Sequence, residues 1–346
     1  MPRLMSWSRR FAPAALRASL PPGRPADHRG RPGATAIGPL RWAHRLAVTT
    51  ACATALLIVA GGLVTNTGAA LAVPDWPTTF GHNMFLYPWS RMVGGVFYEH
   101  SHRLLGSLVG LLTLGLAASL WLTEPRGWVR RLGLLAVVLV CAQGLAGGLR
   151  VLLVRDALAI VHGCLAQAFF ALTVALAVFT SPAWRAPAAL MPPADGRTAA
   201  WLAMGASAAL YLQIVLGALT THAGWIGLHL AGAIVAVAVP AAAAARVLAR
   251  HARRPALAWP ARALGLLLGV QVTLGLGAYV ARFTGLPVPG GAAAVLALPV
   301  AHRLTASLLL GAAVTLTLHA WRLGRPRAAE VPEAAAAPAM SRRVPA

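Results

Sequence analysis

Charged side chains are scarce in this sequence, and acidic ones are nearly missing. Only 11% of the 346 residues are charged, and lysine does not occur, so all 30 basic residues are arginine. Hydrophobic residues make up 58% of the chain. This scarcity of charge excludes a disordered chain and an ordinary soluble domain. It is typical of a protein that crosses a membrane several times.

The net charge of +22 does not indicate nucleic-acid binding, because the arginines form short clusters between long apolar runs. Such clusters are typical of the cytoplasmic flanks of membrane helices. We therefore expect no nucleic-acid partner.

Cysteine is rare as well. The three cysteines, Cys52, Cys141 and Cys164, all lie inside apolar runs, and no two of them have the spacing of metal ligands. An odd number of cysteines in membrane helices argues against a disulfide framework. We expect them to be small buried apolar side chains.

Neither end of the chain carries a long apolar run. Residues 1–44 are rich in Arg, Pro and Gly, and they lack the early apolar region of a cleavable signal peptide. We expect a disordered cytoplasmic tail over 1–44 and a similar tail over 321–346.

Between these tails, eight apolar runs reach the roughly 20 residues that a spanning helix needs. They cover 45–66, 102–122, 131–149, 157–180, 199–219, 225–247, 261–281 and 297–320. Arginines follow every even-numbered run, which predicts that both termini are cytoplasmic. The predicted fold is an all-α membrane protein of eight transmembrane helices. They form two pseudo-symmetric four-helix bundles, 45–180 and 199–320, joined by a cytoplasmic linker over 181–198.

The two predicted bundles share short sequence repeats. Residues 61–68 (GGLVTNTG) match 217–224 (GALTTHAG) at the first, third, fifth and last positions. A glutamine also precedes a glycine by four residues at Gln143, Gln213 and Gln271. These matches favour an internal duplication, although glycine and alanine also recur at any packed interface of membrane helices.

Four histidines hold equivalent places near the outer ends of the even-numbered helices: His102, His162, His229 and His302. Each is followed four residues later by glycine or alanine, on the same helix face. A flat patch beside an imidazole would let a porphyrin approach the backbone, and imidazole is a common axial ligand of heme iron. We therefore predict heme ligation by His102 with His162 and by His229 with His302, one heme in each bundle.

Two other interpretations of these histidines are an interfacial side chain and a zinc ligand. A lone histidine at the end of a membrane helix is often only an interfacial side chain. Zinc fits less well, because no cysteines or carboxylates accompany the four histidines. His82, His100 and His222 are weaker candidates. His82 falls in a loop with Pro and Gly, His100 is two residues from His102 and so points elsewhere on a helix, and His222 stands where the first half has Asn66.

Charged residues accompany two of the predicted ligands. Arg103 and Arg303 directly follow His102 and His302, and a guanidinium pairs well with a heme propionate. Snorkelling toward the membrane surface would also explain them.

Glu99 lies three residues before His102 and has no counterpart in the second half. We predict a catalytic role for Glu99 in proton transfer, although a glutamate can also simply favour a helix start. The preceding outer loop contains Pro74-Asp75-Trp76-Pro77, which could be a lid or a structural cap.

The pattern GGLVTNTG…VPDWP…EHSHR…QGLAGG…QIVLGALTTHAG…QVTLG…HR resembles the heme A synthase family over roughly residues 45–320. The resemblance implies an oxidoreductase that converts the C8 methyl of heme O to a formyl group, which gives heme A for cytochrome oxidase. It implies that His102 and His162 flank the substrate heme O, that His229 and His302 ligate a permanent heme b, and that Glu99 is the essential acidic residue. Many members carry a cysteine pair in the first outer loop, and this sequence has none there.

The same resemblance implies partners: a farnesyltransferase that makes heme O, assembly proteins of cytochrome oxidase and a membrane electron acceptor. A homo-oligomer stays open. The alternatives are a dihaem b-type electron carrier, a heme transfer or assembly factor without chemistry, and a small-molecule transporter.

Overall fold

The computed structural model of the chain describes residues 37–187 and 189–324. Eight long helices make up most of this part: α1 (Ile37–Asn66), α2 (Gly95–Thr123), α3 (Gly127–Leu153), α4 (Asp156–Thr180), α6 (Pro193–Ala223), α7 (Ile226–His251), α8 (Pro255–Phe283) and α9 (Gly291–Leu323). All eight are long and apolar enough to cross a membrane. The protein is therefore an integral, multi-pass membrane protein, and the described part holds no β-strand beyond one isolated bridge.

The predicted helices are all present, but several begin earlier than expected. Helix α2 starts at Gly95 instead of 102, because the polar residues before His102 find partners within the protein, as described below. Helix α1 starts at Ile37, so the prediction of a tail over 37–44 was wrong. The predicted linker 181–198 contains the short helix α5 (Pro182–Arg185) and the start of α6. Helix α9 continues to Leu323, so the prediction of a tail over 321–323 was also wrong. The remaining tail predictions, for 1–36 and 325–346, lie outside the described residues.

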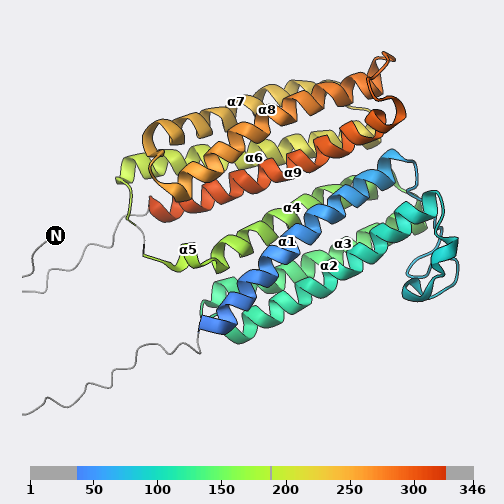
Figure 1. Cartoon of the computed structure of the whole chain (residues 1–346), viewed down its shortest axis with the longest axis horizontal. Coiled ribbons are helices and arrows are strands. Elements are labelled where there is room, and N and C mark those ends of the chain that lie inside the picture. Colours follow the sequence, from blue (N-terminus) through green and yellow to red (C-terminus); the bar gives the residue numbers. More distant parts are fainter. Residues whose placement is uncertain (1–36, 188, 325–346) are drawn as a thin grey trace, which may run out of the picture.

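The helices gather in two groups, which we call the N-terminal bundle (α1–α4) and the C-terminal bundle (α6–α9). In Figure 1 the two bundles lie side by side with the axes of their helices roughly aligned, and α5 lies between them at one end. Helices α1 and α4 contact α9, and α4 also contacts α6, so these four helices form the junction between the bundles. Helices α2, α3, α7 and α8 lie on the outside.

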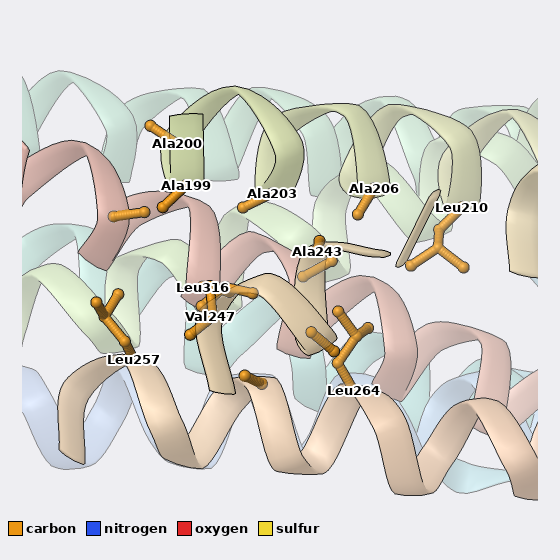
Figure 2. Packing of buried hydrophobic residues seen from close by; sticks show 14 of the residues in the cluster. Ala199, Ala200, Ala203, Ala206, Leu210, Ala243, Val247, Leu257, Leu264 and Leu316 are labelled. Atoms are coloured by element: carbon orange, nitrogen blue, oxygen red, sulfur yellow. The ribbon is translucent and has the colours of Figure 1, made fainter. Parts of the chain in front are cut away.

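Small residues let the helices of the C-terminal bundle approach closely, as expected where lipid supplies no hydrophobic drive for association. Ala199, Ala203 and Ala206 of α6 are fully or almost fully buried. Figure 2 shows this alanine row facing larger side chains of the neighbouring helices, among them Leu264 of α8 and Leu316 of α9.

The two ends of the molecule differ in their connections. At one end, which we call the loop end, residues 67–94 link α1 to α2, with two short 3-10 helices, η1 (Met84–Leu86) and η2 (Trp89–Arg91). This loop lies beside the ends of α2 and α3 (Figure 1). The opposite end, which we call the linker end, carries α5. The four predicted ligand histidines all lie in the half of their helices nearer the loop end.

Candidate functional site

The structure brings the four histidines together in the two predicted pairs. The ring centres of His102 and His162 are 6.4 Å apart, and those of His229 and His302 are 6.3 Å apart. The planes of the rings meet at 78° and 79°. An imidazole–metal bond of about 2 Å, with about 1 Å more from nitrogen to ring centre, puts two axial rings about 6 Å apart. Both pairs therefore have the spacing of two ligands on opposite sides of one metal ion.

Each of these histidines packs against a glycine of the helix that precedes its own. An added Cβ would lie closer to Cε1 of the histidine than an ordinary van der Waals contact: 3.1 Å for Gly61 and His102, 3.2 Å for Gly147 and His162, 3.3 Å for Gly217 and His229, and 2.9 Å for Gly275 and His302. Only a residue without a side chain fits against the ring this closely. Sequence reasoning noticed these glycines as repeats but did not assign them this contact.

Several atoms around the pairs have no partner. Nδ1 of His102 and of His302 is buried without a hydrogen bond, and so is Oε1 of Gln143, Gln213 and Gln271. Buried polar atoms are seldom left unpaired in a complete protein. A Cβ placed on Gly106, one turn after His102, would also meet nothing within 4 Å. The residues present therefore fit a bound heme in each bundle.

The hydrogen bonds around the two histidine pairs differ. In the C-terminal bundle the Gln213 amide nitrogen lies 3.1 Å from Nδ1 of His229, and the Gln271 amide nitrogen lies 3.3 Å from Nε2 of His302. In the N-terminal bundle Nδ1 of His162 faces the backbone oxygen of Gln143 at 3.2 Å. No glutamine stands at the equivalent position on α1, where Leu57 precedes Gly61 by four residues. Glutamine amides therefore lie within hydrogen-bonding distance of both rings of the second pair, and the described residues show no such hydrogen bond to a ring of the first pair.

Glu99 is buried and holds the loop of residues 67–94. Its Oε2 accepts hydrogen bonds from the backbone N–H groups of Leu71 and Val73, both at 3.0 Å. Its Oε1 accepts one from Arg103 at 2.6 Å, one helical turn away. Both oxygens are therefore engaged by the loop and by Arg103, while the predicted role of Glu99 in proton transfer stays a prediction.

Arg103 also faces the loop. Its guanidinium donates to the carbonyl oxygens of Val73, Asp75 and Thr78 at 2.9, 2.7 and 3.0 Å. The side chains of Arg103 and Glu99 are only 9% and 6% exposed. Both terminal nitrogens of this guanidinium are therefore engaged by the loop and by Glu99. These contacts favour a loop-holding role for Arg103 over the predicted contact with a propionate.

The remaining charged and histidine candidates take separate positions. Arg303 lies 3.4 Å from the hydroxyl of Thr65 on α1. His100 is buried beneath the loop, where Nδ1 lies 3.1 Å from the hydroxyl of Thr79. His82 is exposed in the loop, and His222 is half-buried near the end of α6. None of the three competing histidines joins a pair.

The prediction that all three cysteines are buried is wrong. Cys52 and Cys141 are exposed on the outside of their helices, and Cys164 is half-buried. The prediction of buried side chains fails for the first two because the outer face of a membrane helix is apolar without being covered by protein.

Comparisons with known proteins identify the family. A model of the family described as cytochrome oxidase assembly protein matches residues 44–226, more than half of the chain. The chain belongs to this family. Among curated proteins, a heme A synthase of Shouchella clausii (strain KSM-K16) is 34% identical over 105 residues, which are 30% of this chain and 34% of the relative. The match thus spans about a third of the length of the relative. In this member of the cytochrome oxidase assembly family, the matched region contains the first histidine pair and the loop above it.

Proposed function

We propose that this protein is a heme A synthase, which oxidises the C8 methyl of heme O to a formyl group. The observation that carries the proposal is the pair of matched histidine sites, each with the ring spacing of a six-coordinate heme. Membership in the cytochrome oxidase assembly family and the heme A synthase relative support the same activity. In each of two oxidations the methyl carbon would gain a hydroxyl group from water and lose two electrons to the membrane electron acceptor, with release of two protons. The resulting hydrated aldehyde would lose water to give the formyl group.

The two bundles divide the work in this proposal. His102 and His162 hold the substrate heme O in the N-terminal bundle, and His229 and His302 hold a permanent heme b in the C-terminal bundle. Heme b, when bound, supplies one-electron transfer. The protein orients the substrate, keeps the glycine-packed rings fixed and excludes water from the site. Arg303, half-buried and without a carboxylate partner among the described residues, is the proposed contact for a heme b propionate.

The proposal also includes an orientation. The arginine clusters predict cytoplasmic termini, so the loop end faces the outside and both heme sites lie toward the outer leaflet. The proposed partners are the farnesyltransferase that supplies heme O, the assembly proteins that receive heme A and an electron acceptor in the membrane.

The test is to purify the protein, record its absorption spectrum, supply heme O and identify the extracted pigments. The wild-type protein should yield heme A. The variant His102→Ala should retain heme b but form no heme A, while His302→Ala should lose the heme b spectrum. The variant His82→Ala removes an exposed loop histidine and is the matched control, with wild-type pigments expected.

The other outcomes would identify the alternatives. Bound heme with no heme A from the wild-type protein would indicate a dihaem electron carrier. Heme O that binds and leaves unchanged would indicate a transfer or assembly factor. A protein without any heme spectrum would contradict the proposal entirely.

A further inference from the structure

We infer that Trp76 is a positioning residue for the tetrapyrrole held by His102 and His162, with Glu99 and Arg103 as the clamp that keeps Trp76 in place. The inference rests on the proposed function, because it names what orients the substrate at that site. It assigns the outer loop a part in the reaction and gives Glu99 a task that needs no proton transfer.

The first support is the number of bonds that fasten the loop to α2. Five hydrogen bonds from or to Glu99 and Arg103 reach backbone atoms of the loop between Leu71 and Thr78. The two side chains also pair with each other at 2.6 Å. Arg103 directly follows His102 in the sequence, so the loop is attached beside one of the two predicted ligands.

The second support is the contact of the loop with α3. Trp76 lies on Gly148, and a Cβ at that position would overlap the indole ring. The neighbouring Gly147 packs against His162, the other ligand of the pair. The segment between the two attachments therefore crosses from the helix of His102 to the helix that supports His162, and Trp76 lies at the far attachment.

Asp75 stiffens the segment at its turn. Its carboxylate accepts hydrogen bonds from the backbone N–H of Phe80 at 2.8 Å and of Gly81 at 2.9 Å. Its carbonyl oxygen accepts one of the Arg103 bonds at the same time. Trp76 is thus held between two fixed neighbours, Asp75 and Gly148, which leaves its ring few alternative positions.

The C-terminal bundle has none of these parts. The residue after Gly275, at the place of Gly148, is Leu276, which is 65% exposed. At the places of Glu99 and Arg103 stand Ile226 and Leu230, and the connection between α6 and α7 consists of Gly224 and Trp225 alone. A structural feature that is present at only one of two similar heme sites is expected to serve the function in which the sites differ. In the proposed function that difference is the substrate of the N-terminal bundle, which must be oxidised at one methyl group.

A large, half-buried indole at the mouth of the site would restrict the macrocycle to one orientation and exclude water from its edge. Both oxidations act on the same methyl carbon, so the second needs the same orientation as the first. A displaced Trp76 should therefore slow conversion and let the alcohol leave before the second step.

The test uses two matched glycine substitutions in α3 of the full-length protein. Gly148→Ala places a methyl group where the indole lies, while Gly144→Ala adds the same group at an exposed position with nothing within 4 Å. With heme O supplied, Gly148→Ala should lower kcat for heme A by about tenfold or more, since small misplacements of a substrate are costly. It should also raise the ratio of alcohol to formyl product, and Gly144→Ala should change neither value.

Two further variants keep the test decisive if Gly148→Ala does not fold. Trp76→Ala should raise the same product ratio without adding any atoms, and Trp76→Phe should restore part of the wild-type ratio. A ratio unchanged in Trp76→Ala would overturn the inference while the wild-type protein still makes heme A. If the wild-type protein makes none, the proposed function itself fails, so the two failures are distinguishable.

The clamp is tested separately by proteolysis. Arg91 is exposed in the loop, so trypsin can report loop mobility by cleavage after it. Glu99→Ala should accelerate that cleavage and raise the alcohol ratio together. If Glu99→Ala abolishes heme A formation while cleavage after Arg91 stays at the wild-type rate, Glu99 does not act through the loop and the clamp is rejected.

Discussion

The two bundles have nearly the same histidine geometry, but the connections between helices beside their histidine pairs are very different. Their ring-to-ring distances differ by only 0.1 Å, and all four rings lie against glycines. Beside the first pair, the connection from α1 to α2 (residues 67–94) forms a loop with many hydrogen bonds, whereas the equivalent connection from α6 to α7 has only two residues, Gly224 and Trp225, and residues 284–290 join α8 to α9. The two bundles therefore share the geometry of their histidine pairs and differ in the connection beside each pair. A difference in function between the bundles should therefore arise from the loop of residues 67–94 and from the side chains next to the histidine rings.

The largest expected difference between the bundles is in stability, at the linker end. Glu124, between α2 and α3, is 2% exposed and accepts hydrogen bonds from Arg126 at 2.7 Å and Arg185 at 2.9 Å. Breaking such a buried pair leaves the arginines uncompensated, so Glu124→Gln should cost about 2 kcal/mol after allowance for their partial exposure. The C-terminal bundle offers a matched pair, Asp195 with Arg246, at 3.3 Å and about one third exposed.

Asp195→Asn should therefore cost less than about 1 kcal/mol. The measurement is the thermal unfolding midpoint of both variants in the same detergent. Equal shifts would show that burial of Glu124 does not distinguish the two bundles.

The next effect concerns the glutamines, and it sharpens the comparison between the two histidine pairs. Mutation of a group that hydrogen-bonds to a metal-binding histidine typically lowers the affinity for the metal by about 10- to 100-fold. Gln213→Leu removes the amide that lies 3.1 Å from His229. We expect heme in the C-terminal bundle to be lost about tenfold faster, measured by its transfer to an apo-globin acceptor.

Gln143→Leu is the matched control in the N-terminal bundle. It removes an amide whose oxygen has no partner, and it keeps the backbone oxygen that faces His162. Retention of the heme in the N-terminal bundle by this variant should equal that of the wild type. Equal losses in both variants would mean that the glutamines act only by packing.

The pairing of the histidines could be predicted from the sequence better than the contacts of the loop of residues 67–94. The pairs of His102 with His162 and of His229 with His302 follow from equivalent places in repeated helices, which periodicity and spacing can reveal. The task of Arg103 could not be predicted, because its partners between Val73 and Thr78 belong to an irregular loop. The start of α2 at Gly95 was missed for the same reason, since a polar helix end is stable there only through that loop.

The contact of Trp76 with Gly148 shows the same limit. It joins a loop to a helix more than 70 residues later, and no local pattern marks either residue as a partner of the other. The sequence carried only a weak signal, because Gly148 directly follows Gly147, just as Gly62 follows Gly61. Without a second chain to compare, that second glycine could not be told from ordinary helix packing.

The smallest expected effect concerns acid and the loop of the N-terminal bundle. Burial alone would raise the pKa of Asp75, but hydrogen bonds from Gly81, Thr78 and Phe80 outweigh it and lower the pKa to about 2. Because this folded-state pKa lies below the ordinary value of 3.8, the ionised carboxylate stabilises the loop above pH 3.8. That contribution is lost progressively as the pH falls from 3.8 toward about 2.

Pepsin, which is active in acid, can report this loss by cleaving near Phe85 and Leu86, which are 64% and 78% exposed. Cleavage of the wild-type loop should accelerate over that pH range beyond the intrinsic pH dependence of pepsin on an unfolded substrate. Asp75→Asn should show the faster cleavage already above pH 3.8. Cleavage at the short connection of the C-terminal bundle should not change in either protein, because Gly224 and Trp225 offer no carboxylate. If Asp75→Asn and wild type are cut at the same rate above pH 3.8, the carboxylate does not hold the loop, and the difference between the connections must rest on Glu99 and Arg103 alone.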